Sequence, residues 1–205
     1  MLGVVIAHVK LWLFNKRTNN KVFSIRCSLD SIKFSNIEVQ EHSIIDSRSL
    51  IGANTYIGYN CCITRSEIGS FCSIANMVSI GNGEHDINKI STNSLFYEDP
   101  YNDLTIGETK LGNDVWVGVG AIIRRGVTVG NGAVVGANSF VNRDIPPYAV
   151  VAGSPAKIIK YRFTKDIINK IDKSEWFSLP LDEAKIKIEN LKRELFNDNA
   201  NFINL

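Results

Sequence analysis

His85 is the residue whose type and position in the sequence most strongly suggest chemistry. It stands between Glu84 and Asp86, and the chain has only three histidines. A neutral imidazole can accept a proton near pH 7, and a flanking carboxylate can raise its pKa or orient its ring. From the residues alone, a surface-loop histidine without a catalytic role stays an open alternative. His8 falls in an N-terminal helical segment and His42 before a regular repeat, and we interpret both as structural or exposed.

The segment around His85 interrupts an internal repeat. Large aliphatic residues recur every six positions, with one five-residue step, and a small residue usually follows each. The aliphatic positions are Ile51, Ile57, Ile63, Ile68, Ile74 and Ile80, and then Leu111, Val117, Ile123, Val129, Val135 and Val141. A period of six is neither that of an α-helix nor simple strand alternation, and it predicts a short strand and a tight corner per unit. Three units would close a triangular coil of about eighteen residues, and such coils stack at roughly 4.8 Å.

The break in this repeat predicts a loop over residues 84–105 that leaves the stack. Side chains of a regular coil point into the core or into solvent, so an extruded loop is better suited to build a pocket. His85 would lie at the base of this loop, held by a rigid coil.

The composition narrows the function classes. The formal net charge is +2, and the sequence has no Lys/Arg block of the kind that follows a phosphate backbone, which argues against nucleic acid. The four cysteines form no C-x-x-C pair, and their spacing resembles no zinc site. Cys61 and Cys72 take the small interior position of the repeat, so we interpret them as packing residues. A reduced, cytoplasmic protein is the plain interpretation.

The N-terminal segment Leu2–Phe14 is apolar, and Val5, Val9 and Trp12 fall on one helical face. It is too short to span a bilayer. It predicts a helix that covers the core, or a helix that makes weak contact with the inner surface of a membrane.

The C-terminal part predicts two helices. Thr164 can cap the first, and the second follows Pro180 with apolar residues at helical spacing, namely Ala184, Ile188, Leu191 and Leu195. We therefore divide the chain into an N-terminal helix and leader (1–35), a repeat domain (36–160) and a helical extension (161–205).

Three motifs carry a family resemblance: "IGSFCSIANMVSIGNGEHDINKIST", "LGNDVWVGVGAIIRRGVTVGNGAVVGANSFVNRDIPPYAVVAGSPAKIIKYRF" and a following "EWF". Over residues 36–180 the sequence resembles the hexapeptide-repeat acyltransferases, within them the xenobiotic and polysaccharide O-acetyltransferase branch. The resemblance implies a mainly β fold, a left-handed parallel β-helix with an extruded active-site loop. One departure is Asp86, which stands where many relatives have proline after the histidine.

The resemblance also implies the site. His85 would be the general base, acetyl-CoA the acyl donor, and no metal would take part. The family's contacts with CoA map onto the backbone at Gly118, Val119 and Ala137 and onto the side chains of Asn142, Arg143, Lys157 and Lys160. Asn82 and Trp116 would contact the acceptor. Family members are typically homotrimers with active sites between subunits.

The function implied is acetyl transfer in a ternary complex to a hydroxyl of a bacterial surface glycan or its sugar precursor. A streptogramin- or chloramphenicol-type drug is the alternative acceptor, and N-acetylation of an amino sugar nucleotide is a third. A carbonic anhydrase of the same fold would need three histidine ligands, whereas only His42 and His85 lie outside the N-terminal helix. A purely structural solenoid would leave the histidine-bearing loop unexplained.

Overall fold

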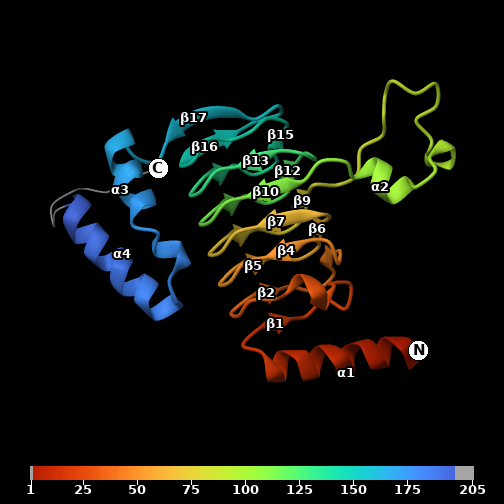
Figure 1. Ribbon diagram of the computed structural model, residues 1–205, viewed down its shortest axis with the longest axis horizontal. Coiled ribbons are helices and arrows are strands. Elements are labelled where there is room, and N and C mark those ends of the chain that lie inside the picture. The colour runs from red at the N-terminus through yellow and green to blue at the C-terminus, as the bar shows by residue number, and fades with distance from the viewer. Residues whose placement is uncertain (1, 197–205) are drawn as a thin grey trace. The chain divides into compact units, whose positions relative to one another are not determined.

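The computed structural model describes residues 2–196, and most of these residues form a parallel β-helix (Figure 1). The prediction of a mainly β fold is confirmed. The coils form about seven turns and close with an antiparallel strand at the C-terminal end.

Each regular coil contributes one short strand to each of three sheets, which we call A, B and C. Sheet A contains β1 (Lys21–Val22), β2 (Glu38–Val39), β5 (Tyr56–Ile57), β8 (Ser73–Ile74), β11 (Trp116–Val117), β14 (Val134–Val135), β16 (Ala149–Ala152) and β17 (Lys157–Tyr161). Sheet B contains β3 (Ile44–Ile45), β6 (Cys62–Ile63), β9 (Ser79–Ile80), β12 (Ile122–Ile123) and β15 (Phe140–Val141). Sheet C contains β4 (Leu50–Ile51), β7 (Ser66–Ile68), β10 (Thr109–Leu111) and β13 (Thr128–Val129).

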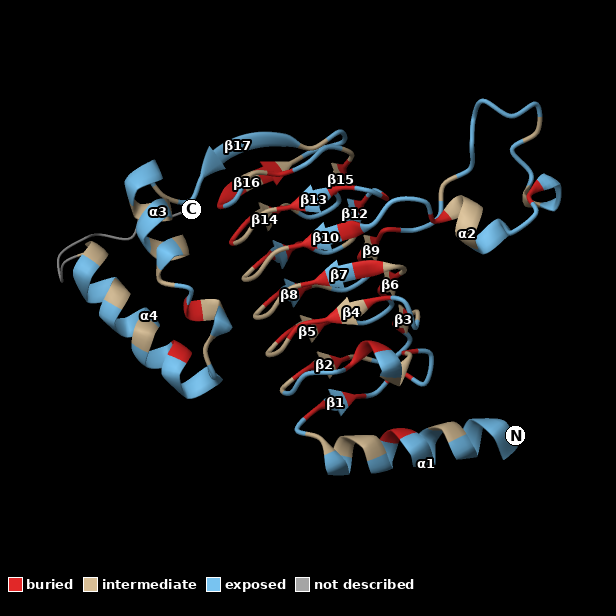
Figure 2. Cartoon of the chain, viewed as in Figure 1, coloured by how far each residue is buried: buried red, intermediate tan, exposed pale blue. Residues whose placement is uncertain are grey.

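The repeated aliphatic residues form the core inside the coils, as predicted. All twelve are at most 3% exposed, and the buried residues follow the inside of the stack (Figure 2). Cys61 and Cys72 are each 1% exposed, and burial raises the pKa of both thiols, that of Cys72 to about 12. The small residues after the aliphatics are required by the stacking, since a Cβ on Gly69 would lie 2.5 Å from the carbonyl oxygen of Gly112 in the next coil.

The strand pairing begins earlier than the regular repeat. The sequence placed residues 1–35 outside the β-helix, but β1 pairs with β2, and Cys27 forms a parallel bridge with Ile45. This first coil escapes the pattern because it contains the 3₁₀ turn η1 (Leu29–Ser31) and lacks the period of six.

The N-terminal helix α1 (Leu2–Arg17) runs across this end of the stack (Figure 1). The helix is confirmed, but the expected packing face is wrong. Leu11 and Phe14 contact the core, whereas Val5, Val9 and Trp12 are more than half exposed.

The described residues from 162 to 196 belong to a second compact unit. It contains α3 (Lys165–Lys173), the 3₁₀ turn η3 (Trp176–Ser178) and α4 (Leu181–Phe196). Thr164 occupies the N-cap position of α3 but makes no capping hydrogen bond through its side chain. The last residues of the predicted extension, 197–205, lie outside the described part of the chain.

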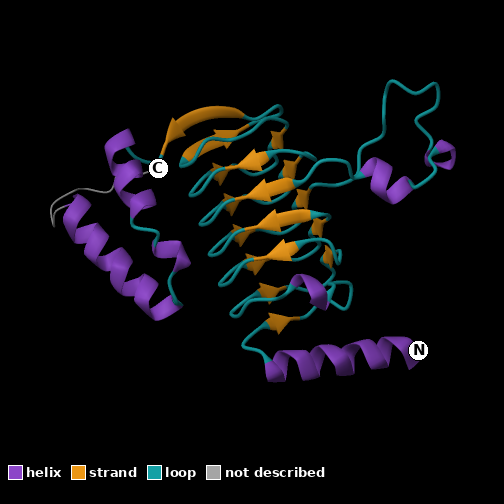
Figure 3. Ribbon diagram, viewed as in Figure 1, coloured by secondary structure: helices purple, strands orange, loops and turns teal. Residues whose placement is uncertain are grey.

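The predicted excursion leaves the stack between β9 and β10 (Figure 3). It contains the 3₁₀ turn η2 (Ser94–Phe96) and α2 (Pro100–Leu104), and it extends slightly beyond the expected limits. Partners in adjacent coils are 18 residues apart at Asn113 and Asn131, but 43 apart across the excursion at Ser70 and Asn113. The two strands on either side of the excursion therefore keep their places in the stack.

Candidate functional site

His85 lies at the start of the excursion, and its ring is oriented by a backbone carbonyl. Its Nδ1 forms a short hydrogen bond with the carbonyl oxygen of Thr92. Because a carbonyl oxygen only accepts, Nδ1 must carry the proton in this contact, and Nε2 of the neutral ring keeps its lone pair. His85 is exposed, so this nitrogen can be reached from outside.

Tyr97 contacts both His85 and the backbone of the residue after it. It is 8% exposed, and its ring meets that of His85 edge to face, with the centroids 6.1 Å apart. Its hydroxyl oxygen accepts a hydrogen bond of 2.8 Å from the backbone N–H of Asp86. A proline at position 86 could not donate this bond, so the departure from the family pattern has a structural use here.

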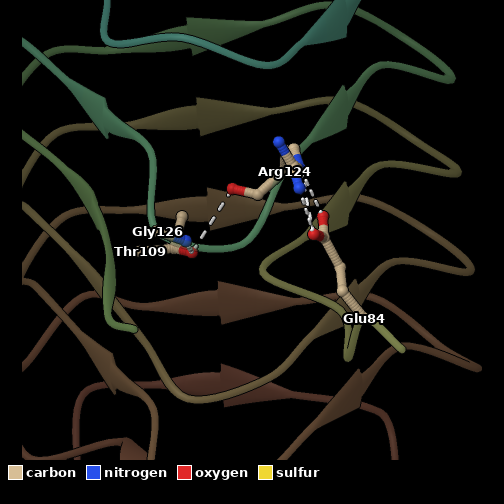
Figure 4. A network of polar contacts seen from close by, with 4 residues as sticks. All are labelled: Glu84, Thr109, Arg124 and Gly126. Atoms are coloured by element: carbon tan, nitrogen blue, oxygen red, sulfur yellow. Dashed lines mark hydrogen bonds and ion pairs between the residues drawn. The ribbon is translucent and has the colours of Figure 1, made fainter. Parts of the chain in front are cut away.

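Glu84 and Asp86 do not orient the imidazole, contrary to what their positions suggested. The Glu84 carboxylate accepts bonds from Nε and Nη2 of Arg124, the shortest 2.6 Å (Figure 4). The Asp86 carboxylate accepts from the N–H of Asn88 at 2.9 Å. The orienting group is instead Thr92, seven residues along the chain.

Arg125 ties the returning end of the excursion to the stack. It is 8% exposed, its Nη1 donates to the carbonyls of Arg65 and Gly107, and its Nη2 donates to the carbonyl of Thr64 at 2.8 Å. Burial lowers the pKa of the guanidinium. Gly107 lies where the chain returns to the stack, so one side chain joins this return to an earlier coil.

Asp46 anchors α2 in a similar way. Its carboxylate accepts hydrogen bonds from the Tyr101 hydroxyl, the Ser49 hydroxyl and the N–H of Arg65. Partial burial alone would raise the pKa of Asp46, but these hydrogen bonds outweigh burial and hold it below its usual range. The ionised carboxylate is thus the form that holds the loop.

A second group of predicted residues lies at a different corner from His85. His85 follows β9 of sheet B, whereas this group lies between sheets A and B. Gly118 and Val119 follow β11, and Ala137 follows β14 in the adjacent coil. Gly118 is required by packing, since a Cβ there would lie 2.6 Å from the nitrogen of Ala137. Within residues 2–196, neither the N–H of Val119 nor that of Ala137 donates a hydrogen bond to the protein.

The preceding coils show why the N–H of Val119 is free. At the same corner, the side-chain oxygen of Asn76 accepts from the N–H of Tyr59 in the preceding coil, at 2.9 Å. Val119 lacks such a cap because its partner one coil on is Ala137, which has no polar side chain. The corner therefore presents two stacked N–H groups to a ligand.

The predicted cations lie at the C-terminal end of the stack. Lys157 and Lys160 are three residues apart, which would place them on opposite faces of a regular strand. A bulge in β17 instead pairs them with Ala152 and Val150, the outward-facing residues of β16. Arg143 is exposed just after β15, with Asn142 half-buried beside it.

Asn82 and Trp116 lie at different corners. Asn82 is exposed beside His85, and its side-chain oxygen accepts from the Thr64 hydroxyl at 3.3 Å. Trp116 is 53% exposed in β11, next to the corner that carries Val119. One chain thus presents a histidine corner and an amide corner on the two sides of sheet B.

Among the described residues, no group of three or more His, Cys, Asp or Glu side chains could hold a metal ion.

Comparisons with known proteins fit this arrangement. The family model "Bacterial transferase hexapeptide (six repeats)" matches residues 108–143. A probable macrolide acetyltransferase from Lysinibacillus sphaericus is 37% identical over 144 residues, which cover 62% of this chain and 77% of that protein. The chain belongs to the hexapeptide-repeat acyltransferases.

Two other members of this family match over a smaller share of their length. A chloramphenicol acetyltransferase from Morganella morganii is 42% identical over 129 residues, or 58% of this chain and 61% of that protein. Galactoside O-acetyltransferase from Escherichia coli is 35% identical over 131 residues, or 62% of this chain and 58% of that protein. The chain thus spans less than two thirds of these two relatives.

Sequence reasoning missed the residues that hold this hexapeptide-repeat protein's loop. Thr92 and Tyr97 orient His85, and Arg125, Asp46 and Tyr101 fasten the excursion. The sequence contains a weak signal for Arg125, because this charged residue lies within the apolar repeat, next to Arg124. The orientation of its side chain, toward the base of the loop, depends on the fold.

We predict that Arg125→Met lowers the melting temperature and opens the excursion, because it removes the hydrogen bonds of a buried guanidinium to three backbone carbonyls, each worth about 1.5–3 kcal/mol. Limited proteolysis within residues 84–104 should become faster. Arg124→Met is the matched control, since it breaks only an exposed pair worth up to about 1 kcal/mol. Equal effects of the two substitutions would contradict the anchoring role of Arg125.

Proposed function

We propose that the protein is an acetyl-CoA-dependent O-acetyltransferase in which His85 is the general base. The observation that carries this proposal is the contact between Nδ1 of His85 and the Thr92 carbonyl, which leaves Nε2 as an exposed proton acceptor. A base of this kind accepts the proton of an acceptor hydroxyl as the hydroxyl oxygen attacks the thioester carbonyl. The same proton can then pass from the imidazolium to the departing thiolate, so that the base is regenerated.

The free amides at the second corner support the donor part of the proposal. The N–H of Gly118 pairs with the carbonyl of Val135, so it is committed to the stack. The N–H groups of Val119 and Ala137 are available to hold the amide-rich pantetheine arm, or to stabilise negative charge on the thioester oxygen during attack. Of the three residues whose backbone is expected to contact acetyl-CoA, two therefore have an N–H group that is available.

The cations at the end of the stack fit the phosphates of the same donor. The bulge in β17 places Lys157 and Lys160 on one face, where they can act together on a phosphate. Arg143 and Asn142 follow β15, which binds the β16–β17 turn through hydrogen bonds of Phe140 with Gly153 and Ala156. A donor lying along the stack would thus meet amides first and cations near its end.

For the acceptor we propose a sugar hydroxyl of a bacterial surface glycan or of its lipid-linked precursor. The match to a galactoside O-acetyltransferase supports a sugar. The second candidate is a drug hydroxyl, supported by the 42% identity to a chloramphenicol acetyltransferase. Assays with glycan repeat units, amino sugar nucleotides, chloramphenicol and virginiamycin separate these acceptors directly.

We also propose a homotrimer whose sites lie between subunits. This accounts for the separation of the two corners, because His85 of one chain could face the amides of a neighbour across a shared cleft. In a cyclic trimer, each site would then use one corner from each of two chains.

We predict that His85→Ala lowers turnover by about 10²–10⁴-fold, because the hydroxyl loses its proton acceptor. Steady-state kinetics with a glycan or drug acceptor measures the loss, and isothermal calorimetry should show unchanged affinity for acetyl-CoA. Near-normal turnover of the variant would remove His85 from the mechanism.

We predict that Ala137→Asn raises the KM for acetyl-CoA about threefold to tenfold, at unchanged melting temperature. The new side chain would cap the N–H of Val119 as Asn76 caps that of Tyr59, and the donor would lose one hydrogen bond of about 0.5–1.5 kcal/mol. Ser70→Asn introduces the same side chain at the corner between sheets C and A and serves as the control. An unchanged KM in Ala137→Asn would place the donor elsewhere.

Mixed oligomers test whether the two corners combine across subunits. We predict that chains carrying His85→Ala, co-expressed with chains carrying Ala137→Asn, form about one intact site in four under random mixing. At low acetyl-CoA concentration, activity should exceed the average of the two variants measured separately. Activity no higher than the average of the two separate variants would place both corners of each site in one chain.

A further inference from the structure

α1 is a surface helix with an unusually apolar exterior. Of residues 2–17, only Leu11 is buried. A helix that is apolar on most sides is normally enclosed by protein or lipid. In the described chain this helix instead leaves large aliphatic side chains open to solvent (Figure 2).

The face that α1 turns toward the coils is fixed by specific contacts. Asn15 donates through Nδ2 to the carbonyl of Val22 at 2.8 Å and accepts from its N–H at 3.0 Å. Leu11 and Phe14 contact the core on the same side. These contacts leave the opposite side of the helix, away from the stack, without protein cover among the described residues.

That opposite side is a continuous apolar stripe, which we call the outer face. Its members are Leu2, Val5, Ile6, Val9 and Leu13, which recur three or four positions apart and are 37–75% exposed. Their spacing places them opposite Leu11, at about 100° per residue.

Cations and an aromatic ring border the outer face. Lys10 and Arg17 lie along one edge and Trp12 along the other. Lys16 follows the stripe at its C-terminal end, with its ammonium 4.2 Å from the centre of the Trp12 ring. The segment Leu2–Arg17 contains no aspartate or glutamate. An apolar stripe with basic borders and a tryptophan is typical of a helix that lies in a membrane interface.

We propose that the outer face of α1 binds the surface of a membrane that contains anionic lipids. The helix lies on the bilayer and does not cross it, since sixteen residues give about 24 Å against a hydrocarbon core of about 30 Å. Throughout residues 2–196, no helix has the length and apolar character needed to cross a membrane. Charge selects anionic lipid over a second copy of this chain, because the same helix of a second copy has no carboxylate to pair with Lys10, Lys16 and Arg17, whereas lipid phosphates do. The proposal does not depend on acetyl transfer.

Vesicle co-sedimentation of the full-length protein tests this binding. We expect the protein to bind vesicles containing about 30% phosphatidylglycerol in phosphatidylcholine better than phosphatidylcholine alone, and to bind less in about 0.5 M salt. Trp12 should enter an apolar environment, so a blue shift of tryptophan fluorescence should appear on binding and be absent in Trp12→Phe. Failure of the protein to bind either kind of vesicle would overturn the proposal.

The double variant Val5→Glu/Val9→Glu places two carboxylates on the outer face, and glutamate has a higher helix propensity than valine. We expect it to weaken vesicle binding about tenfold or more, with an unchanged melting temperature and oligomeric mass. Ile186→Glu is the matched control, because Ile186 is a 64% exposed aliphatic residue of α4. Wild-type-like vesicle binding by the double variant would refute the assignment. A lowered oligomeric mass by light scattering would assign the outer face to contacts between copies instead.

Discussion

Backbone hydrogen bonds between successive coils are the constraint on which the whole structure depends. In the central coils, Trp116 donates to the carbonyl of Ala133 and Gly118 to that of Val135, at 3.0 and 2.8 Å. These bonds lock the register, so residues one coil apart lie above one another and the aliphatic side chains form continuous columns inside. A regular coil has little freedom left for chemistry. Freedom remains where the backbone turns a corner or leaves the stack, and the candidate residues gather at those places.

The corner between sheets A and B shows how small a change leaves a backbone N–H available to a ligand. The N–H that follows the corner glycine has no partner in the ladder and must find one elsewhere. Asn76 caps the N–H of Tyr59 with its side-chain oxygen, whereas Ala137 leaves the N–H of Val119 without a cap. A ligand that accepts hydrogen bonds can then replace asparagine without any rearrangement of the backbone, because stacking has already fixed the amide. The proposed donor site is preorganised for this reason.

The same constraint explains what the sequence could and could not predict. The repeat, its interruption and the buried cysteines follow from a local period, and each appears where the spacing placed it. The partners of Arg125 are different, because its bond to the Arg65 carbonyl spans 60 residues and no local pattern encodes it. The spacing of Lys157 and Lys160 alone predicts that they lie on opposite faces of a strand. They share a face because of a bulge, which arises from the pairing of β17 with β16. The packing face of α1 was assigned wrongly because its exposed face is as apolar as the face that packs on the coils. The hydrophobic pattern therefore could not indicate which face is buried.

The stack also relates the proposed membrane contact to the proposed reaction. With α1 on the lipid surface, the first coil would stand about one helix diameter above it, and the coil that carries His85 three coil spacings higher. At about 10 Å for the helix and roughly 4.8 Å per coil, His85 would lie on the order of 25 Å from the lipid headgroups. A sugar attached directly to a lipid phosphate would remain too close to the surface to reach that imidazole. An acceptor carried on a lipid would therefore need several sugars between its anchor and the reacting hydroxyl, which fits an assembled glycan repeat unit better than a lipid-linked monosaccharide.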